Sequence, residues 1–171
     1  MSFSSEVKNE LARIESHDSV SDKAELLALL RMSGAIIMRG MSVGIHFSTE
    51  NAALARRVLQ LLKGNYQVQT EIVITRSRRL KKNNRYLVQV VPSPQVPKAM
   101  VELQLLSVEG DLKNPLLSSL AAKKTYLRGA FLGGGSVSRP NSDYHMEMVT
   151  ENESFARTLI KASRASLRRP R

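Results

Sequence analysis

The sequence predicts an α/β (α+β) protein in which one folding unit occurs twice and the second copy is incomplete. Three observations lead to this prediction. Helical and strand-like apolar patterns alternate along the 171 residues, and a short motif recurs in the second half. Hydrophobic residues make up 42% of the chain, whereas aromatic residues make up only 5% and Trp is absent. The core must therefore be mostly aliphatic.

Two helices are predicted before residue 35. Phe3, Val7, Leu11 and Ile14 recur at helical spacing behind Ser4 and Ser5, which are candidate N-caps. The second helix is predicted to open at Asp22, with Glu25 completing a capping box, and to end at about Gly34.

The following elements alternate between strand and helix. Residues 36–48 are predicted as strand with a turn near Arg39-Gly40, and a helix starts at Thr49 or Asn51 and stops at Gly64. The later predictions are strands over 68–75 and 85–91, a break at Pro92, Pro94 and Pro97, a short helix over 98–106, and a helix from Asn114-Pro115 to about Gly133.

The repeat is a gapless match between the two halves of the chain. Residues 49–56, TENAALAR, return at 150–157 as TENESFAR, so the offset is 150 − 49 = 101. The same offset places apolar residues on apolar residues, for example Ile45 on Met146 and Phe47 on Met148. A helix–strand–helix register held without a gap indicates an internal duplication.

The duplication predicts a division of the chain. We expect an N-terminal helical segment (1–21), a first repeat (22–97), a linker with a short helix (98–113), a partial second repeat (114–162) and a basic tail (163–171). The counterpart of the strands over 68–91 would fall at 169–192. The sequence ends at Arg171, so the second copy is expected to be truncated.

Positive charge is concentrated in one segment. The chain has a formal net charge of +11, and six of the ten residues from 76 to 85 are basic while none is acidic. The segment lies between two predicted strands, with Asn83-Asn84 suited to the turn of a β-hairpin. Such a hairpin fits a DNA groove, with its cations on phosphates. The candidate contact residues are Arg76, Arg78, Arg79, Lys81, Lys82 and Arg85. A solvated loop that only aids solubility is the alternative.

Other candidate sites are weak. The glycine run from Gly129 to Gly135 has no Lys and ends a helix, so it does not predict a phosphate-binding loop. Gly129 and Gly133 instead predict a close helix–helix contact, and Arg128 is expected to be solvated or to face DNA. His17, His46 and His145 lack metal-ligand spacing, and Cys is absent, so neither a metal site nor a cofactor is predicted.

Two copies of a small-residue helix that ends in Gly, followed by strands and a helix, resemble the LAGLIDADG homing-endonuclease fold. In that family the two motif helices pack together, and acidic residues at their ends hold divalent metal over the scissile phosphates. The corresponding positions here are Ser33 and Gly134, neither of which is acidic. The resemblance therefore implies two LAGLIDADG-like repeats that have lost the metal-binding carboxylates.

Three segments are similar to one branch of that fold. MSFSSEVKNEL at 1–11, RRLKKNNRY at 78–86 and YLRGAFLGGGSV at 126–137 resemble the WhiA family, bacterial DNA-binding regulators tied to sporulation and cell division. The resemblance extends to about Ala162. WhiA proteins continue into a C-terminal helix-turn-helix domain, which this sequence lacks, so the promoter specificity of that domain is not implied here.

The resemblance implies a non-catalytic DNA-binding protein that regulates transcription in the bacterial cytoplasm, associated with the nucleoid. A metal-dependent homing-type nuclease and an RNA- or protein-interaction module are the alternatives. No secretion signal is evident, and the apolar stretch over 26–38 is interrupted by Arg31 and too short to cross a membrane. A membrane partner and a small-molecule substrate are therefore not expected, and the sequence favours no particular oligomeric state.

Overall fold

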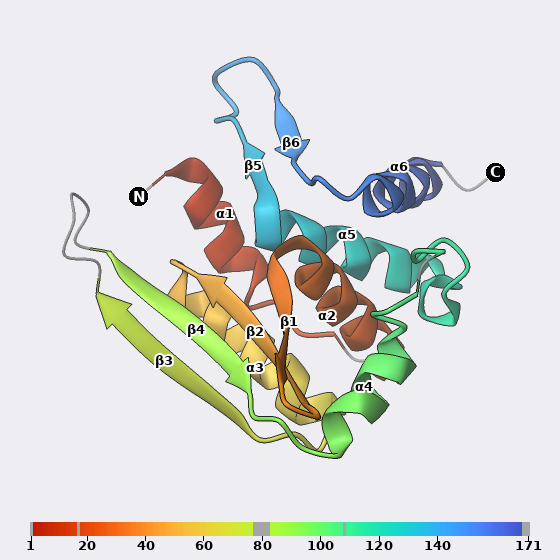
Figure 1. Cartoon of the computed structure of the whole chain (residues 1–171). Coiled ribbons are helices and arrows are strands. Elements are labelled where there is room, and N and C mark those ends of the chain that lie inside the picture. Colours follow the sequence, from red (N-terminus) through yellow and green to blue (C-terminus); the bar gives the residue numbers. More distant parts are fainter. Residues whose placement is uncertain (1, 17, 77–82, 108, 169–171) are drawn as a thin grey trace.

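The computed structural model describes residues 2–16, 18–76, 83–107 and 109–168. This part of the chain forms helices and two antiparallel sheets (Figure 1). The larger sheet has four strands in the order β1-β2-β4-β3, and the smaller one pairs β5 with β6. The mixed α/β fold class predicted from the sequence is confirmed.

As far as α5, the helices and strands follow one another in the order that the apolar patterns predict, except for the short helix η1; β5, β6 and α6 follow where the repeat implies a strand region and a helix. Their bounds are α1 (Phe3–Leu11), α2 (Ser19–Ser33), β1 (Gly34–Arg39), β2 (Ser42–Thr49), α3 (Ala52–Asn65), β3 (Thr70–Arg76), β4 (Asn84–Val90), α4 (Gln95–Leu103), the 3-10 helix η1 (Pro115–Leu117), α5 (Leu120–Gly134), β5 (Gly135–Val137), β6 (Met146–Met148) and α6 (Glu153–Leu167).

The two halves of the chain repeat the same local structure at the predicted offset. Both ends of α2 are shifted by 101 residues relative to those of α5, and α3 and α6 begin at equivalent positions. Asn51 and Asn152 cap these last two helices in the same way, each accepting from the N–H three residues on at 3.0 Å. The repeat in the sequence is therefore a repeat in the fold.

Helices α2 and α5 pack side by side at the centre of the molecule (Figure 1). Small residues allow this approach: a Cβ added at Gly129 would lie 2.4 Å from the carbonyl oxygen of Glu25. A Cβ at Gly133 would lie 2.9 Å from the Cβ of Met32. The close helix contact predicted from these two glycines is confirmed.

The four-stranded sheet buries one face against helices. Ile45 and Phe47 of β2 and Val88 and Val90 of β4 are at most 4% exposed, and they join the buried side of α3 in the core. Because successive strand residues point to opposite faces, the residues between them lie on the other face of the sheet. In Figure 1 that other face is toward the viewer, with α3 behind the sheet.

The segment between the repeats is held to the central helices by a buried carboxylate. Asp111, 1% exposed, accepts two hydrogen bonds from the Arg31 guanidinium, at 3.0 and 3.1 Å. It also accepts one from the Tyr126 hydroxyl at 2.8 Å. Burial, and next the charge of Asp111, raise the pKa of Tyr126, so this hydroxyl remains a donor.

Three predicted helix starts are wrong. Ser2, not Ser4 or Ser5, caps α1, accepting from the Ser5 N–H at 3.2 Å. The second helix begins at Ser19, because Asp18 accepts from the Val20 N–H and supplies the cap four residues before Asp22. The short helix predicted over 98–106 begins at Gln95, with Pro97 tolerated in its first turn.

Two other boundaries differ from the prediction. Asn114 caps only the short helix η1, and α5 starts at Leu120 with its own cap, Ser119, so one predicted helix is two elements. Gly64 does not stop α3, which ends one residue later at Asn65.

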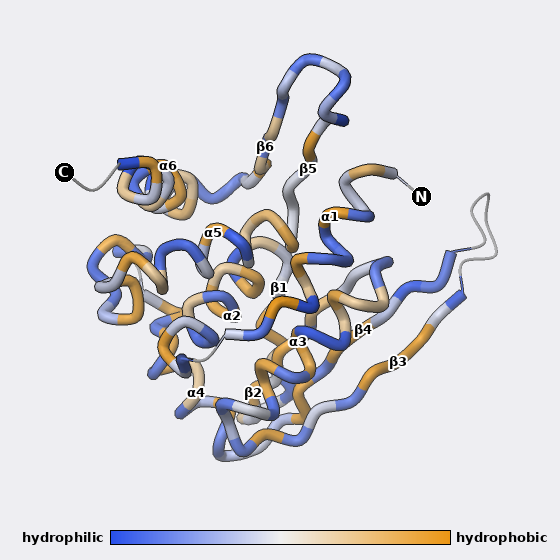
Figure 2. Tube along the Cα trace, turned by 180° about the vertical axis from the view of Figure 1, so that it is seen from behind, coloured by the Kyte–Doolittle hydropathy of each residue, from blue (hydrophilic) through white to orange (hydrophobic). Residues whose placement is uncertain are grey.

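Hydrophilic residues cluster at two projecting places. The tube in Figure 2 is blue where β3 and β4 approach the undescribed residues 77–82, and in the loop between β5 and β6. Within the described ranges, no helix has the length and the apolar character needed to cross a membrane.

Candidate nucleic-acid interface

Strands β3 and β4 hold the ends of the basic segment. They pair antiparallel, from Thr70 opposite Val90 to Arg76 opposite Asn84. Of the six candidate contact residues, Arg76 and Arg85 lie in these strands, and both are exposed. Arg78, Arg79, Lys81 and Lys82 fall outside the described residues. The two described arginines thus flank the connection between the strands, as the sequence predicts for the base of a hairpin.

Arg85 lies on the open face of the sheet. Tyr86 and Val88 of β4 are on the core side of the strand, so Arg85, one residue before Tyr86, lies on the opposite side, near the end where β4 begins. Its Nε donates to the Ser48 hydroxyl of β2 at 2.7 Å. Among the described residues, this is the one hydrogen bond that the guanidinium forms, and its two terminal nitrogens can also donate.

The rest of that face is mixed, with the apolar pair Leu87 and Val73 between polar residues. The strand register places His46 of β2 opposite Gln89 of β4, and Gln89 opposite Glu71 of β3. Among the described residues of β3 and β4, Glu71 is the one carboxylate. Apart from Leu87 and Val73, this part of the face carries an amide, hydroxyls and Arg85 with little negative charge, which is compatible with a polyanion.

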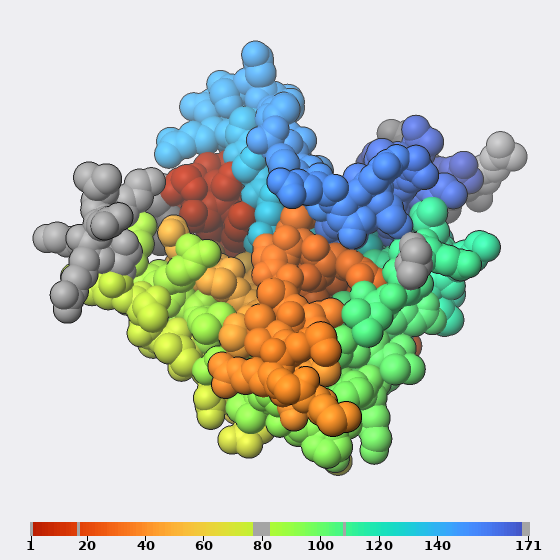
Figure 3. Space-filling view, in the orientation of Figure 1, coloured from red at the N-terminus to blue at the C-terminus, as the bar shows by residue number. Residues whose placement is uncertain are grey.

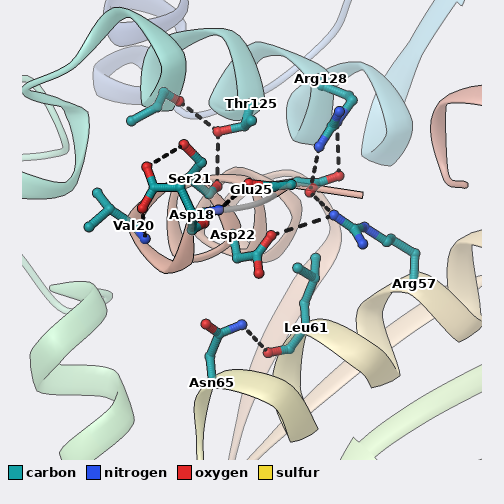
Figure 4. Close-up of polar contacts among 12 residues, drawn as sticks. Asp18, Val20, Ser21, Asp22, Glu25, Arg57, Leu61, Asn65, Thr125 and Arg128 are labelled. Carbon is teal, nitrogen blue, oxygen red and sulfur yellow. Dashed lines mark hydrogen bonds and ion pairs between the residues drawn. The ribbon is translucent and has the colours of Figure 1, made fainter. Parts of the chain in front are cut away.

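A buried ion-pair cluster joins α2, α3 and α5. Glu25 of α2 is fully buried and accepts from Arg57 of α3 at 2.7 Å and from Arg128 of α5 at 3.1 and 3.2 Å (Figure 4). One carboxylate thereby joins three helices. The two arginines share the single negative charge of Glu25. The carboxylate therefore compensates only part of the cost of burying the two positive charges.

This cluster corrects two sequence predictions. Glu25 does not close a capping box, since it lies in the second turn of α2 and faces the core. Arg128 is not solvated and does not face DNA, because it is bound to Glu25 and its side chain is only 14% exposed. A single sequence gives no signal for the cluster, because Glu25 is 32 residues from Arg57 and 103 from Arg128.

Asp22 lies one turn before Glu25 and is the weakest member of the group. One of its carboxylate oxygens is 3.7 Å from Arg57, and that oxygen is buried without a hydrogen bond among the described residues. Burial raises the pKa of Asp22, an effect that the nearby Arg57 opposes and Glu25 reinforces.

The positions equivalent to the metal-binding carboxylates lie at the adjoining ends of α2 and α5. The Ser33 hydroxyl donates to the carbonyl oxygen of Gly133 at 2.9 Å. A Cβ at Gly134 would lie 2.6 Å from the sulfur of Met32, so the space of a larger side chain is already filled. Ser33 and Gly134 therefore offer one hydroxyl and no side chain at the two positions where a nuclease of this fold has carboxylates.

A grouping of three or more potential metal ligands does not occur among the described residues. His145 and Glu147 approach each other at 3.3 Å on β6 and the residue before it, and both side chains are more than half exposed. Zinc sites use four ligands, and this pair offers two.

The repeats match models of one protein family. Residues 19–106 match the model of the WhiA N-terminal LAGLIDADG-like domain, and residues 123–167 match that of the WhiA LAGLIDADG-like domain. The chain belongs to the WhiA family. The predicted limits of 22–97 and 114–162 for the two repeats remain predictions, as does the basic tail, of which residues 163–167 are helical in α6.

WhiA proteins of several bacteria are similar over almost all of this chain. The sequence is 41% identical over 167 residues to the "Probable cell division protein WhiA" of Alkaliphilus metalliredigens, covering 93% of this chain and 53% of that protein. It is 39% identical to the protein of the same name from Desulforamulus reducens, covering 94% and 52%. The chain thus spans about half the length of these WhiA relatives.

Two solved WhiA structures share the fold. The N-terminal LAGLIDADG domain of DUF199/WhiA superposes with a TM-score of 0.69 and 25% identity, covering 94% of this chain and 72% of that one. Full-length DUF199/WhiA from Thermatoga maritima gives a TM-score of 0.67 and 24% identity, covering 95% and 49%. The LAGLIDADG-like fold expected from the sequence is confirmed.

Proposed function

We propose that this chain binds DNA without cleaving it. The observation that carries the proposal is the concentration of cations around the β3–β4 connection. Residues 76–85 hold six basic residues and no acidic one. Arg76 and Arg85 flank this segment at the ends of paired strands, and Arg85 points to the open face of the sheet.

Elementary electrostatics favours DNA as the partner. Cations close together repel one another, and a polyanion relieves that repulsion while it releases counterions to the solvent. A two-stranded ribbon has the width of the major groove, and Arg side chains can donate to phosphates and to guanine. The open face beside the ribbon offers further polar groups.

The proposal that DNA is not cleaved rests on the residues at the ends of α2 and α5. Ser33 and Gly134 stand where a nuclease of this fold needs carboxylates for divalent metal. Without a metal ion, little stabilises the charge that develops on a phosphodiester during hydrolysis.

The cellular role is part of the same proposal. The WhiA relatives are named as probable cell division proteins. We extend this to a bacterial regulator of transcription that acts in cell division or sporulation, in the cytoplasm at the nucleoid.

The test measures duplex binding by fluorescence anisotropy while salt is varied. One variant replaces Arg76, Arg78, Arg79, Lys81, Lys82 and Arg85 by Ser. The control variant removes six exposed cations elsewhere: Lys98, Lys124, Arg157, Lys161, Arg164 and Arg168. Both variants lose the same charge, so they differ only in where the charge was.

The hairpin variant is expected to lose most of its affinity. In a plot of the logarithm of affinity against the logarithm of salt concentration, the slope should be smaller in magnitude by about 0.9 for each phosphate that the variant no longer neutralises. The control should keep a slope close to that of the wild type. Equal slopes in all three proteins would contradict the assignment to the hairpin. Stronger competition by structured RNA than by duplex DNA would favour an RNA-binding module.

A further inference from the structure

Beside the hairpin lies a large cleft that the sequence does not predict. It has a volume of about 1020 Å³ and opens between α1, the start of α3 and the ends of β2 and β4. Figure 3 shows part of this region, where α1 (red) adjoins the sheet. Asn83 and Arg85 line it, so the cleft begins where the β3–β4 connection ends.

The lining has a surplus of positive charge. Four cations from separate parts of the chain reach it, namely Lys8, Arg13, Arg56 and Arg85, against one carboxylate, Glu50. A smaller hollow of about 210 Å³ shares Arg13 and Arg56 with the cleft, and Glu15 and Arg57 also line it.

These cations differ from other charged groups of the described chain in their lack of carboxylate partners. Within the described ranges, none of the four forms an ion pair, whereas Arg31, Arg57 and Arg128 are each bound to a carboxylate. Lys8 lies over the Phe131 ring, 5.8 Å from its centroid, and burial lowers the pKa of its amine. A nearby anion would favour the charged form of Lys8.

The walls of the cleft are held in place. The Asn51 side-chain amide donates to Asn9 of α1 at 2.9 Å, while the Asn51 carbonyl oxygen caps α3. On the opposite side, the Ser4 hydroxyl of α1 donates to the Val137 carbonyl oxygen at 3.0 Å and accepts from the Val137 N–H at 2.8 Å. The position of α1 relative to both repeats is therefore fixed, and so is the backbone that carries its cations.

We infer that this cleft binds the phosphodiester backbone of DNA where the duplex leaves the β3–β4 hairpin. The inference rests on the DNA binding proposed above and adds a second contact surface, on α1 and α3. Pockets for small molecules are enclosed and mostly apolar. This one is open, its lining is part polar and part apolar, and four cations belong to it, which favours an anionic ligand over an apolar one.

The test removes two exposed cleft cations, with a control taken from the internal repeat. The variant is Arg13→Gln with Arg56→Gln. At the offset of 101 residues Arg56 corresponds to Arg157, which lies on α6 and is paired with Glu153. The control is therefore Arg157→Gln with Lys161→Gln, which removes the same charge from an exposed helix face. Thermal unfolding followed by circular dichroism checks that all proteins are folded.

Duplex binding is measured against salt for the full chain. The cleft variant should bind about tenfold more weakly, and its salt slope should fall by about 2, one for each phosphate contact. The control should match the wild type. If only the hairpin variant described above loses affinity, the cleft inference is wrong and the proposed function stands. If the wild type does not bind DNA, both are wrong.

A second arm separates a polymer from a small phosphate ligand. Adenosine monophosphate is titrated into the wild type and the cleft variant at constant ionic strength. Weak binding, at millimolar concentration or above, is expected, because one phosphate meets only part of the lining. Tight binding that the cleft variant abolishes, with an unchanged slope for DNA, would overturn the inference in favour of a nucleotide site.

Discussion

Glu25 is the residue on which the largest buried group of charges depends. Its carboxylate is fully buried and lies between two arginines that belong to different helices. Removing one member of a buried ion pair leaves an uncompensated charge in a medium of low polarity. Among the described residues, the loss of Glu25 would leave Arg128 without an ion-pair partner and Arg57 with Asp22 alone, at 3.7 Å.

Glu25→Ala should therefore lower the free energy of unfolding by about 3–5 kcal/mol. Urea denaturation at neutral pH measures the change. Arg157→Ala serves as control, because it breaks the exposed pair with Glu153 and should cost less than about 1 kcal/mol. Equal effects of the two substitutions would mean that the buried cluster does not hold the helices together.

Asp22 should make the stability of the protein depend on pH with a sign opposite to that of most carboxylates. Because burial raises the pKa of Asp22 in the folded state, the folded protein binds its proton more tightly than the unfolded chain does. The charged form therefore opposes folding, and this penalty is present above the folded pKa and vanishes as the pH falls below the ordinary Asp value of 3.8.

Asp22→Asn should accordingly stabilise the protein at pH 7, and the gain should shrink as the pH is lowered toward 4. Chemical denaturation of both proteins across this range measures the difference. A loss of stability at pH 7 would instead mean that the attraction between Asp22 and Arg57 outweighs burial.

At the scale of elements, the contact between α2 and α5 depends on Gly129. Replacing a helical glycine by alanine ordinarily stabilises a helix by about 0.5–1 kcal/mol. At Gly129 the new Cβ would lie 2.4 Å from a backbone oxygen of α2, so the two helices would have to separate.

Gly129→Ala is expected to destabilise the protein, whereas Gly64→Ala in α3 should be neutral or stabilising. A Cβ at Gly64 would meet no atom within 4 Å, which makes it a matched control. Thermal unfolding compares the two variants. A gain of stability from Gly129→Ala would contradict the close packing of the motif helices.

The order of the elements could be predicted because most of them have their own periodic pattern. The internal repeat predicted the same helix–strand–helix order independently in the second half of the chain. Helix starts were harder to place. Several Ser and Asp residues precede α1 and α2, and only the structure distinguishes the cap, Ser2 or Asp18, from its neighbours. The continuous helix expected from Asn114 failed because two caps, Asn114 and Ser119, follow each other closely.

For the candidate interface, the sequence predicts the cations that are close together in the chain and misses those that only the fold brings together. The basic segment over 76–85 is evident from ten consecutive residues. The cleft cations Lys8, Arg13 and Arg56 come from well-separated parts of the chain, and no local excess of charge marks them. The fold assembles this second set, as it assembles Glu25 with its two arginines.

At the scale of the whole molecule, cations from separate elements meet at the cleft beside β4. Arg85, at the start of β4, lines the cleft together with Lys8, Arg13 and Arg56, and Arg76 lies at the facing end of β3. The ends of α2 and α5, where a nuclease of this fold would hold metal, carry Ser33 and Gly134. A DNA-binding surface without a hydrolytic centre accounts for both features.

The measurement that tests this account most directly is a titration of the unmodified chain with a fluorescent duplex at several salt concentrations, with and without Mg²⁺. The DNA is recovered afterwards and its length is checked on a gel. We predict saturable binding that weakens steeply with salt, is similar with and without Mg²⁺, and leaves the duplex intact. A folded, monodisperse sample that does not bind, or that cuts the duplex when Mg²⁺ is present, would contradict the account.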